Sequence, residues 1–199
     1  MNLTLEFDRQ QLDAMESLLG DIPGGFNKAI RMSVNETLRG ISTDAKRTIG
    51  GKSGELNLNV GKVAATFTIV TMTAKGRSGC FRTKDKPISM YEFGAKQLKK
   101  GLGVSFKIKK SRGIHRLPHA FVQKFRGHTA VWMRRKYIGG PAHASGSKGE
   151  QIKKLYTTSI ADYFGNRPVI EEVVNRKAMD RMEKALERST NAVLARYSS

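Results

Sequence analysis

The hydrophobic positions at the start of the chain predict a strand followed by a short helix. Leu3, Leu5 and Phe7 alternate with polar residues, and this two-residue period is typical of a half-buried strand. Apolar residues then fall three or four positions apart over residues 12–19, which favours an amphipathic helix. We expect that helix to end at Gly20, because glycine is unfavourable inside a helix.

A much longer helix is predicted between Asp21 and Ile49. Asp21 is a suitable N-cap, and Pro23 fits the first helical turn, where its missing amide hydrogen costs nothing. One face then carries an apolar stripe, which we expect to pack against a sheet. The stripe consists of Phe26, Ile30, Val34, Leu38, Ile41, Ala45 and Ile49. The glycine-rich residues 50–54 end the helix.

Strand-like segments fill the middle of the sequence. Residues 63–69 and 88–93 alternate between larger apolar side chains and smaller or polar ones. Residues 120–125 and 129–136 are predicted to form the arms of a hairpin, with its turn at residues 126–128. The middle of the chain is therefore expected to form a mainly antiparallel sheet.

The clearest alternation lies between Leu102 and Lys109. Every second residue from Leu102 to Ile108 is apolar, whereas Lys107 and Lys109 belong to the opposite side. This pattern predicts a strand with one dry face and one cationic face.

Residues 168–197 are predicted to form a second long helix, which opens at Pro168. Its length of about 45 Å, at roughly 1.5 Å per residue, exceeds what a small domain covers, so we expect a subunit interface there. Residues 74–86 and 139–150 are rich in glycine, serine and charge, and are expected to be flexible loops. The whole pattern predicts a single α+β domain over residues 1–199, in which a long N-terminal and a long C-terminal helix flank the mainly antiparallel sheet.

The net charge points to a polyanionic partner or an acidic neighbour. The chain carries 36 Lys and Arg residues against 17 Asp and Glu, a formal net charge of +19. The excess is concentrated between Lys75 and Lys136, where 18 basic residues are accompanied only by Asp85 and Glu92. Self-repulsion on this scale opposes compaction unless negative charge lies nearby.

Other features of the sequence narrow the setting. No stretch of about 18 uncharged apolar residues is present, so we expect no membrane span. The N-terminal residues lack the basic and apolar segments of a signal peptide. Cys80 is the only cysteine, which excludes an internal disulfide and is typical of a reducing compartment. Its use as a nucleophile beside a histidine distant in sequence stays open.

Signals for catalysis or metal binding are weak. Residues 51–53 (Gly-Lys-Ser) resemble the end of a P-loop, but Lys46 stands where that motif needs its first glycine. His115 and His119 are separated by Pro118, which opposes a helix that would align both rings on a zinc ion. The basic segment also lacks the clustered acids that a metal-dependent nuclease needs. We therefore expect no enzyme activity, no metal and no cofactor.

The basic residues of the middle segment are the candidate binding site. Each contact with a phosphate would release counterions, which gives binding without sequence reading, and an acidic protein surface would fit equally well. Phe106, Phe121, Phe125 and Trp132 could stack on bases, although their alternation favours burial in the core. The candidate residues are Lys99, Lys100, Lys107, Lys109, Lys110, Arg112, Arg116, Lys124, Arg126, Arg134, Arg135 and Lys136.

Between Arg82 and Gly165 the sequence resembles the minor tail protein Z family, the tail-completion proteins of long-tailed bacteriophages. A lysine- and glycine-rich segment, RTKDKPISMYEFGAKQLKKGLGVSFKIKK, precedes the sequence Pro-His-Ala-Phe at residues 118–121. Gly-His-Thr-Ala-Val-Trp follows at residues 127–132, and IKKLYTTS at residues 152–159 precedes the C-terminal helix. The order of these motifs carries the resemblance, which covers about half of the chain.

The resemblance implies a structural virion protein, made in the host cytoplasm and added at the head-proximal end of a nearly finished tail. It implies self-association into a ring, with a hexamer expected from the symmetry of the tail, beside the tail terminator, tail tube or neck proteins. A basic sheet lining such a ring would hold the end of the packaged DNA electrostatically. The family supplies no catalytic residues. The alternative that the sequence leaves open is a free, nonspecific DNA-binding protein.

Overall fold

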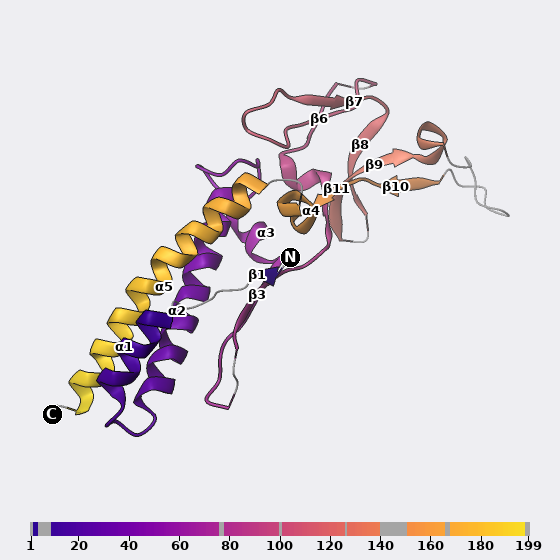
Figure 1. Ribbon diagram of the computed structural model, residues 1–199. Helices are drawn as coiled ribbons and strands as arrows, with labels where there is room; N and C mark the ends of the chain where they lie inside the picture. The colour runs from indigo at the N-terminus through magenta and orange to yellow at the C-terminus, as the bar shows by residue number, and fades with distance from the viewer. Residues whose placement is uncertain are drawn as a thin grey trace. The chain divides into compact units, whose positions relative to one another are not determined.

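The chain folds into helices and small antiparallel sheets (Figure 1). The computed structural model describes residues 2–3, 9–75, 78–99, 101–125, 127–139, 151–165 and 168–197. Two compact units are formed from segments that are distant in sequence. The first unit contains residues 1–45, 64–84 and 164–199, and the second contains residues 46–63 and 85–163. The single domain expected over residues 1–199 stays a prediction.

The helices of the first unit lie side by side (Figure 1). They are α1 (Arg9–Leu19), α2 (Gly25–Ile49) and α5 (Pro168–Tyr197). Arg181 binds Asp44 at 2.6 Å and Arg188 binds Glu36 at 2.5 Å. Because the numbers rise along α5 while they fall along α2, these two helices run in opposite directions.

The apolar stripe of α2 is buried from Val34 to Ile49 as predicted, whereas Phe26 and Ile30 are half-buried and pack on helices and not on a sheet. Met15 and Leu19 of α1, Ala29 of α2, and Leu186 and Val193 of α5 form one buried cluster. The predicted N-cap is wrong, because α2 begins four residues after Asp21, at Gly25. The chain reverses first through Gly24, whose positive φ of 70° suits glycine.

A small sheet of the first unit lies partly where we expected a loop. Its strands, in the order β1-β3-β2, are β1 (Asn2–Leu3), β2 (Phe67–Val70) and β3 (Cys80–Thr83). The prediction of a flexible loop over residues 74–86 is therefore wrong for β3. Phe81 is buried and lies edge-on to Phe67 at 4.9 Å between ring centroids, so one aromatic contact outweighs the polar composition around it.

Asn35 of α2 fixes the chain that follows β2. Its side-chain Nδ2 donates to the Met72 carbonyl at 3.0 Å, and its Oδ1 accepts from the Met72 amide at 2.7 Å. The side chain thus satisfies both polar groups of one backbone residue, as a neighbouring strand would.

The second unit is built from short strands. The hairpin β8 (Ala120–Phe125) and β9 (His128–Arg134) confirms the predicted hairpin, and β10 (Ile152–Lys154) extends it in the order β10-β9-β8. Another sheet has the order β5-β6-β7. Its strands are β5 (Lys96–Gln97), β6 (Val104–Phe106) and β7 (His115–Leu117). The expected single sheet is thus divided into several small ones.

The remaining elements of the described chain are short. They are α3 (Val60–Ala64), β4 (Pro87–Ser89), the 3-10 helices η1 (Met90–Phe93) and η2 (Arg135–Ile138), β11 (Tyr156–Ser159) and α4 (Ile160–Gly165). The strand predicted over residues 63–69 is half wrong, since its start belongs to α3. The strand predicted over residues 88–93 likewise turns into η1, where the chain curls after Ser89.

The core of the second unit joins the two three-stranded sheets. Val104 of β6, Ala120 of β8, and Val131 and Met133 of β9 form a buried cluster. Leu102, however, is 60% exposed, so the apolar side of the predicted strand begins only at Val104.

The fold class is the predicted one. Small antiparallel sheets are flanked by a long N-terminal and a long C-terminal helix, and α5 begins at Pro168 as expected. The expectation of a subunit interface on α5 stays a prediction. Residues 4–8 and 140–150, which hold most of the predicted N-terminal strand and of the second loop, lie outside the described residues.

We expect Asn35→Ala to lower the free energy of unfolding by about 1–3 kcal/mol, because both polar groups of the Met72 backbone lose their partner. Urea denaturation followed by circular dichroism measures this. Asn191→Ala, at an exposed position of α5, is the control and should stay within about 0.5 kcal/mol of the wild type. Equal destabilisation by both substitutions would show that Asn35 has no special role.

Candidate functional site

The positive charge of the chain belongs almost entirely to the second unit. Its residues include 21 Lys and Arg against 5 Asp and Glu, a net charge of +16, whereas the first unit has 15 against 12, a net charge of +3. The positive charge that is concentrated in the middle of the sequence is therefore also concentrated in one of the two folded units.

Glu55, one of the few acids of the second unit, is held inside its structure. The Tyr163 hydroxyl donates a hydrogen bond to the Glu55 carboxylate. Burial raises the pKa of Tyr163 above its ordinary value, and the bond to Glu55 raises it further, because ionised tyrosine would face a second negative charge.

Two further acids of this unit also have structural partners. Glu92 binds Lys62 at 2.9 Å. Asp162 and Ser159 cap the start of α4, since the Asp162 amide donates to Ser159 Oγ at 2.9 Å and the Ser159 amide donates to Asp162 Oδ2 at 3.2 Å. Most of the described negative charge is thus engaged locally, and few acids remain to neutralise the basic surface.

The sheet β5-β6-β7 carries an exposed cationic face. Lys96 of β5 and Arg116 of β7 are both register partners of Ser105, so they project from the same side of the sheet. Lys99 and Arg112, in the connections before β6 and before β7, are also exposed. Lys99 and Arg112 of the predicted set lie in connections at opposite ends of β6. The register places Arg116 of that set on the cationic face and adds Lys96, which the sequence reasoning left out. Lys96 is identified by its pairing with Ser105, which the fold shows and the sequence does not.

Lys107, Lys109 and Lys110 do not form the open cationic side that the alternation predicted. All three are half-buried, and the backbone at Lys109 pairs with Leu56. Lys110 Nζ donates to the carbonyls of Gly51 and Lys52, just past the end of α2. A lysine at a helix C-terminus is stabilised by the helix dipole and by unpaired carbonyls, so the geometry gives Lys110 a structural role.

The basic residues of β8, β9 and η2 are spread apart. Lys124 pairs with Thr129 near the hairpin turn, whereas Arg134 pairs with Ile152 at the other end of β9. Five residues at about 3.3 Å each separate these positions by roughly 17 Å, and alternation puts the two side chains on opposite faces. Arg135 and Lys136 lie in η2, and Lys136 contacts the Tyr137 ring at 5.2 Å. Lys100 and Arg126 lie outside the described residues.

A groove of about 550 Å³ lies between the β5–β6 turn and the sheet β8-β9-β10. His119 and Tyr137 line it with their rings stacked at 4.2 Å between centroids. His119 has a φ of 64°, a conformation that costs energy for any residue with a side chain. Gly103 allows the β5–β6 turn to lie close to the residues just before His119, because a Cβ at Gly103 would be 2.1 Å from the Leu117 carbonyl oxygen. Arg134 completes the lining and gives the groove a positive charge.

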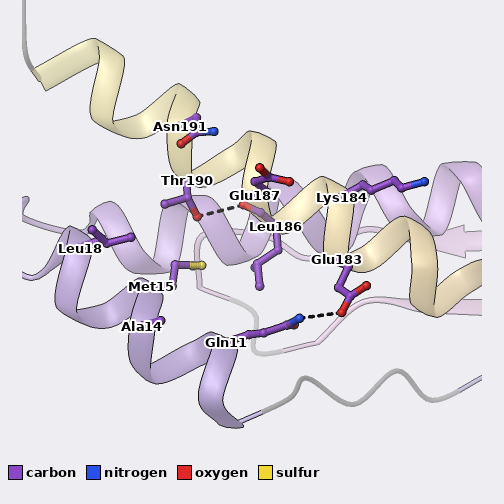
Figure 2. Close-up of a pocket in the computed structure, with 10 residues that line it drawn as sticks. All are labelled: Gln11, Ala14, Met15, Leu18, Glu183, Lys184, Leu186, Glu187, Thr190 and Asn191. Atoms are coloured by element: carbon purple, nitrogen blue, oxygen red, sulfur yellow. Dashed lines mark hydrogen bonds between the residues drawn. The ribbon is translucent and has the colours of Figure 1, made fainter.

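A second groove, of about 470 Å³, lies between α1 and α5 in the first unit (Figure 2). Leu18, Met15 and Leu186 give it an apolar floor, and Gln11 donates to Glu183 across it at 2.8 Å. Glu187 lines the same groove. Two carboxylates against one cation, Lys184, leave the groove with a net negative charge, which disfavours a polyanion, so this groove is not part of the polyanion site.

The described residues contain no cluster of three His, Cys, Asp or Glu side chains that could hold a metal ion. Residues 51–53 follow the helix α2, whereas a P-loop follows a strand. Cys80 is half-buried in β3 of the first unit. Within the part of the chain that the structure describes, no helix is both long enough and apolar enough to cross a membrane.

Comparison with protein-family models, with curated proteins and with solved structures finds no match to this chain. The site therefore has to be interpreted from its own chemistry: exposed cations on β5-β6-β7, a groove with stacked aromatic rings, and few acids.

We expect Lys110→Met to lower the free energy of unfolding by about 1–3 kcal/mol, because the carbonyls after α2 lose a charged donor. Thermal and urea denaturation measure this. Arg112→Met, two residues further on and exposed, removes the same charge and should change stability by less than about 0.5 kcal/mol. Equal stabilities of the two variants would return Lys110 to the set of binding residues.

Proposed function

We propose that this protein is a structural, non-enzymatic component of a long-tailed phage virion, which completes the tail at its head-proximal end. In this proposal the basic surface of the second unit faces DNA or acidic neighbouring proteins. The observation that carries the proposal is the net charge of +16 on the second unit, together with the structural engagement of most of its described acids. The ordered series of motifs between residues 82 and 165 gives the virion assignment.

The exposed cations of β5-β6-β7 are the part of the second unit that suits a polyanion best. Lys96 and Arg116 share a face, and Lys99 and Arg112 are exposed in the connections on either side of β6. Long, exposed basic side chains on a sheet contact phosphates without reading bases, so they bind DNA of any sequence and let it slide. A protein that holds a DNA end and later releases it needs this kind of contact.

Self-association into a ring would multiply this charge. Six copies would place roughly 100 positive charges around a central passage, a field that attracts DNA strongly and falls with ionic strength. The resemblance alone supports the ring and its six-fold symmetry. The described structure offers exposed apolar side chains for such contacts, among them Met179 and Tyr197 of α5.

A free, nonspecific DNA-binding protein is the second candidate. It is favoured by the fact that the cationic face of β5-β6-β7 is already complete and exposed on one copy. The two candidates differ in what happens to particles when the protein is missing, because only a virion component is needed to build them.

Deleting the coding sequence from the phage or prophage that carries it is expected to give full heads and tails of normal length that fail to stay joined. Electron microscopy of the lysate checks this, and the wild-type protein supplied in trans should restore joined particles. Normal numbers of infectious particles in its absence would contradict the virion role and favour the free DNA-binding protein.

We expect the variant with Lys96→Gln, Lys99→Gln, Arg112→Gln and Arg116→Gln to bind duplex DNA more weakly and with a smaller salt dependence. The slope of log K against log salt should fall by up to about 0.9 for each phosphate that the variant no longer neutralises. Fluorescence anisotropy with a labelled duplex at several salt concentrations measures it.

The matched control removes four charges of the same types from the first unit, at exposed positions. It carries Arg39→Gln, Lys177→Gln, Lys184→Gln and Arg196→Gln. We expect its salt slope to stay close to that of the wild type. If both variants lose affinity equally, the total charge matters and the surface does not.

A further inference from the structure

The outer face of the sheet β8-β9-β10 combines aromatic and cationic side chains. Its opposite face is core, since Ala120, Val131 and Met133 are buried. The register places Phe121 and Lys154 on either side of Trp132, and Ile152 beside Arg134. Because alternate residues share a face, these side chains all project outward. We call this surface the aromatic face, and its residues are Phe121, Phe125, Trp132, Arg134 and Lys154.

Trp132 is held as a platform on this face. Its indole Nε1 donates to the Gln123 carbonyl at 2.9 Å, which directs the ring along the sheet toward the neighbouring pair of Gln123 and Ala130. Ala130 is fully buried although it lies on the outer face, as expected beneath a flat ring. Phe125 meets the indole edge-on, at 5.7 Å between centroids and an angle of 78°. Trp132 itself is half-buried, so part of the indole is open to solvent.

Other rings continue the surface. Phe121, the cross-strand partner of Trp132, is half-buried, and Phe125 is 47% exposed. Phe121 and Arg134 also line the groove of His119 and Tyr137, so the aromatic face leads directly into it. The core burial that alternation favoured for the aromatic residues is thus correct for Phe106 and wrong for Phe125, while Phe121 and Trp132 are half-buried.

The charge of this surface has one sign. Its charged members, Arg134 and Lys154, are both cations, and the sequence from Pro118 to Gly139 contains no Asp or Glu. Lys154 Nζ also lies 5.1 Å from the Tyr156 ring. A nucleotide uses both kinds of group, because its phosphate meets a cation while its base stacks on a ring.

We propose that the aromatic face binds single-stranded nucleic acid. Unpaired bases stack on Trp132 and Phe121, while Arg134 and Lys154 contact the phosphates on either side. Exposed aromatic rings on a sheet, interleaved with cations, give binding of this kind with little sequence preference. A duplex keeps its bases stacked inside and cannot use the rings. The site uses residues other than the cationic face of β5-β6-β7, so it can stand or fail independently of the proposed virion role.

Trp132 is the only tryptophan of the chain, so its own fluorescence reports the contact. We expect a twelve-residue oligothymidylate to quench it in the full-length protein, because a stacked base meets the indole directly. Inorganic polyphosphate, which has charge but no bases, should leave the fluorescence nearly unchanged. Equal quenching by polyphosphate, or none by the oligonucleotide, would overturn the proposal.

Variants separate stacking from charge. By anisotropy with labelled oligothymidylate, Trp132→Leu should weaken binding about 5-fold or more, and Trp132→Phe, which keeps a ring, should stay within about 2-fold. Tyr91→Leu, at an exposed ring on η1 of the same unit, is the control. Trp132→Leu should leave duplex affinity within about 2-fold. Circular dichroism shows whether each variant is folded. If Trp132→Leu does not fold, Phe121→Leu is used for the same test.

Two results would contradict the inference. Trp132→Leu and Phe121→Leu could bind the oligonucleotide like the wild type, in which case the rings take no part. Alternatively, sedimentation could show that these variants lose self-association while oligonucleotide affinity is unchanged. The aromatic face would then be a contact between protein copies.

Discussion

The second unit must fold while carrying 21 basic and 5 acidic residues, and this imbalance shapes the rest of the structure. Neutralisation within the unit is impossible, so repulsion has to be relieved by exposure to solvent and by contacts with backbone dipoles. Lys110 follows the second route, because its ammonium group lies against carbonyls past the end of α2. The few acids stabilise local elements, as Asp162 does at the start of α4.

The first unit shows the contrasting case. Its charges nearly cancel, and they pair between helices, with Asp44 bound by Arg181 and Glu36 bound by Arg188. The hydrogen bonds to Asp44 raise the pKa of Arg181 above its ordinary value. The exposed pair of Arg188 and Glu36 contributes little free energy, so much of the stability of the helices comes from the apolar cluster around Met15 and Leu186. The two units therefore differ: the helical unit is stabilised by its apolar core, and the basic unit keeps its charge exposed.

The sequence predicts best what depends on local periodicity. Helix α5 and the β8–β9 hairpin were predicted because their patterns are long enough to outweigh single residues. Strand β3 was missed, since it depends on one contact of Phe81 with Phe67 that composition does not reveal. Contacts between distant segments, such as Asn35 with Met72, leave no periodic trace at all.

The candidate site shows the same limit. Sequence proximity put Lys124 and Arg134 in one set, yet strand register sends them to opposite faces of one sheet. Lys96 was left out, although its pairing with Ser105 puts it beside Arg116 on the exposed face. Whether a basic residue belongs to a surface depends on strand register and on the other groups that bind its side chain. Neither can be predicted from the position of the residue in the sequence.

The two basic surfaces of the second unit differ in what accompanies the charge. On β5-β6-β7 the cations surround Ser105, and such a surface attracts any close array of phosphates through long-range charge alone. On β8-β9-β10 the indole of Trp132, held by its hydrogen bond to Gln123, lies among the cations. An aromatic ring gains stacking energy only from a base that is not already stacked in a duplex. Salt weakens the phosphate contacts of both surfaces through counterion release, whereas the stacking on β8-β9-β10 does not depend on it. In the two proposals, the chain therefore holds paired and unpaired nucleic acid by different forces: charge alone on β5-β6-β7, and charge together with base stacking on β8-β9-β10.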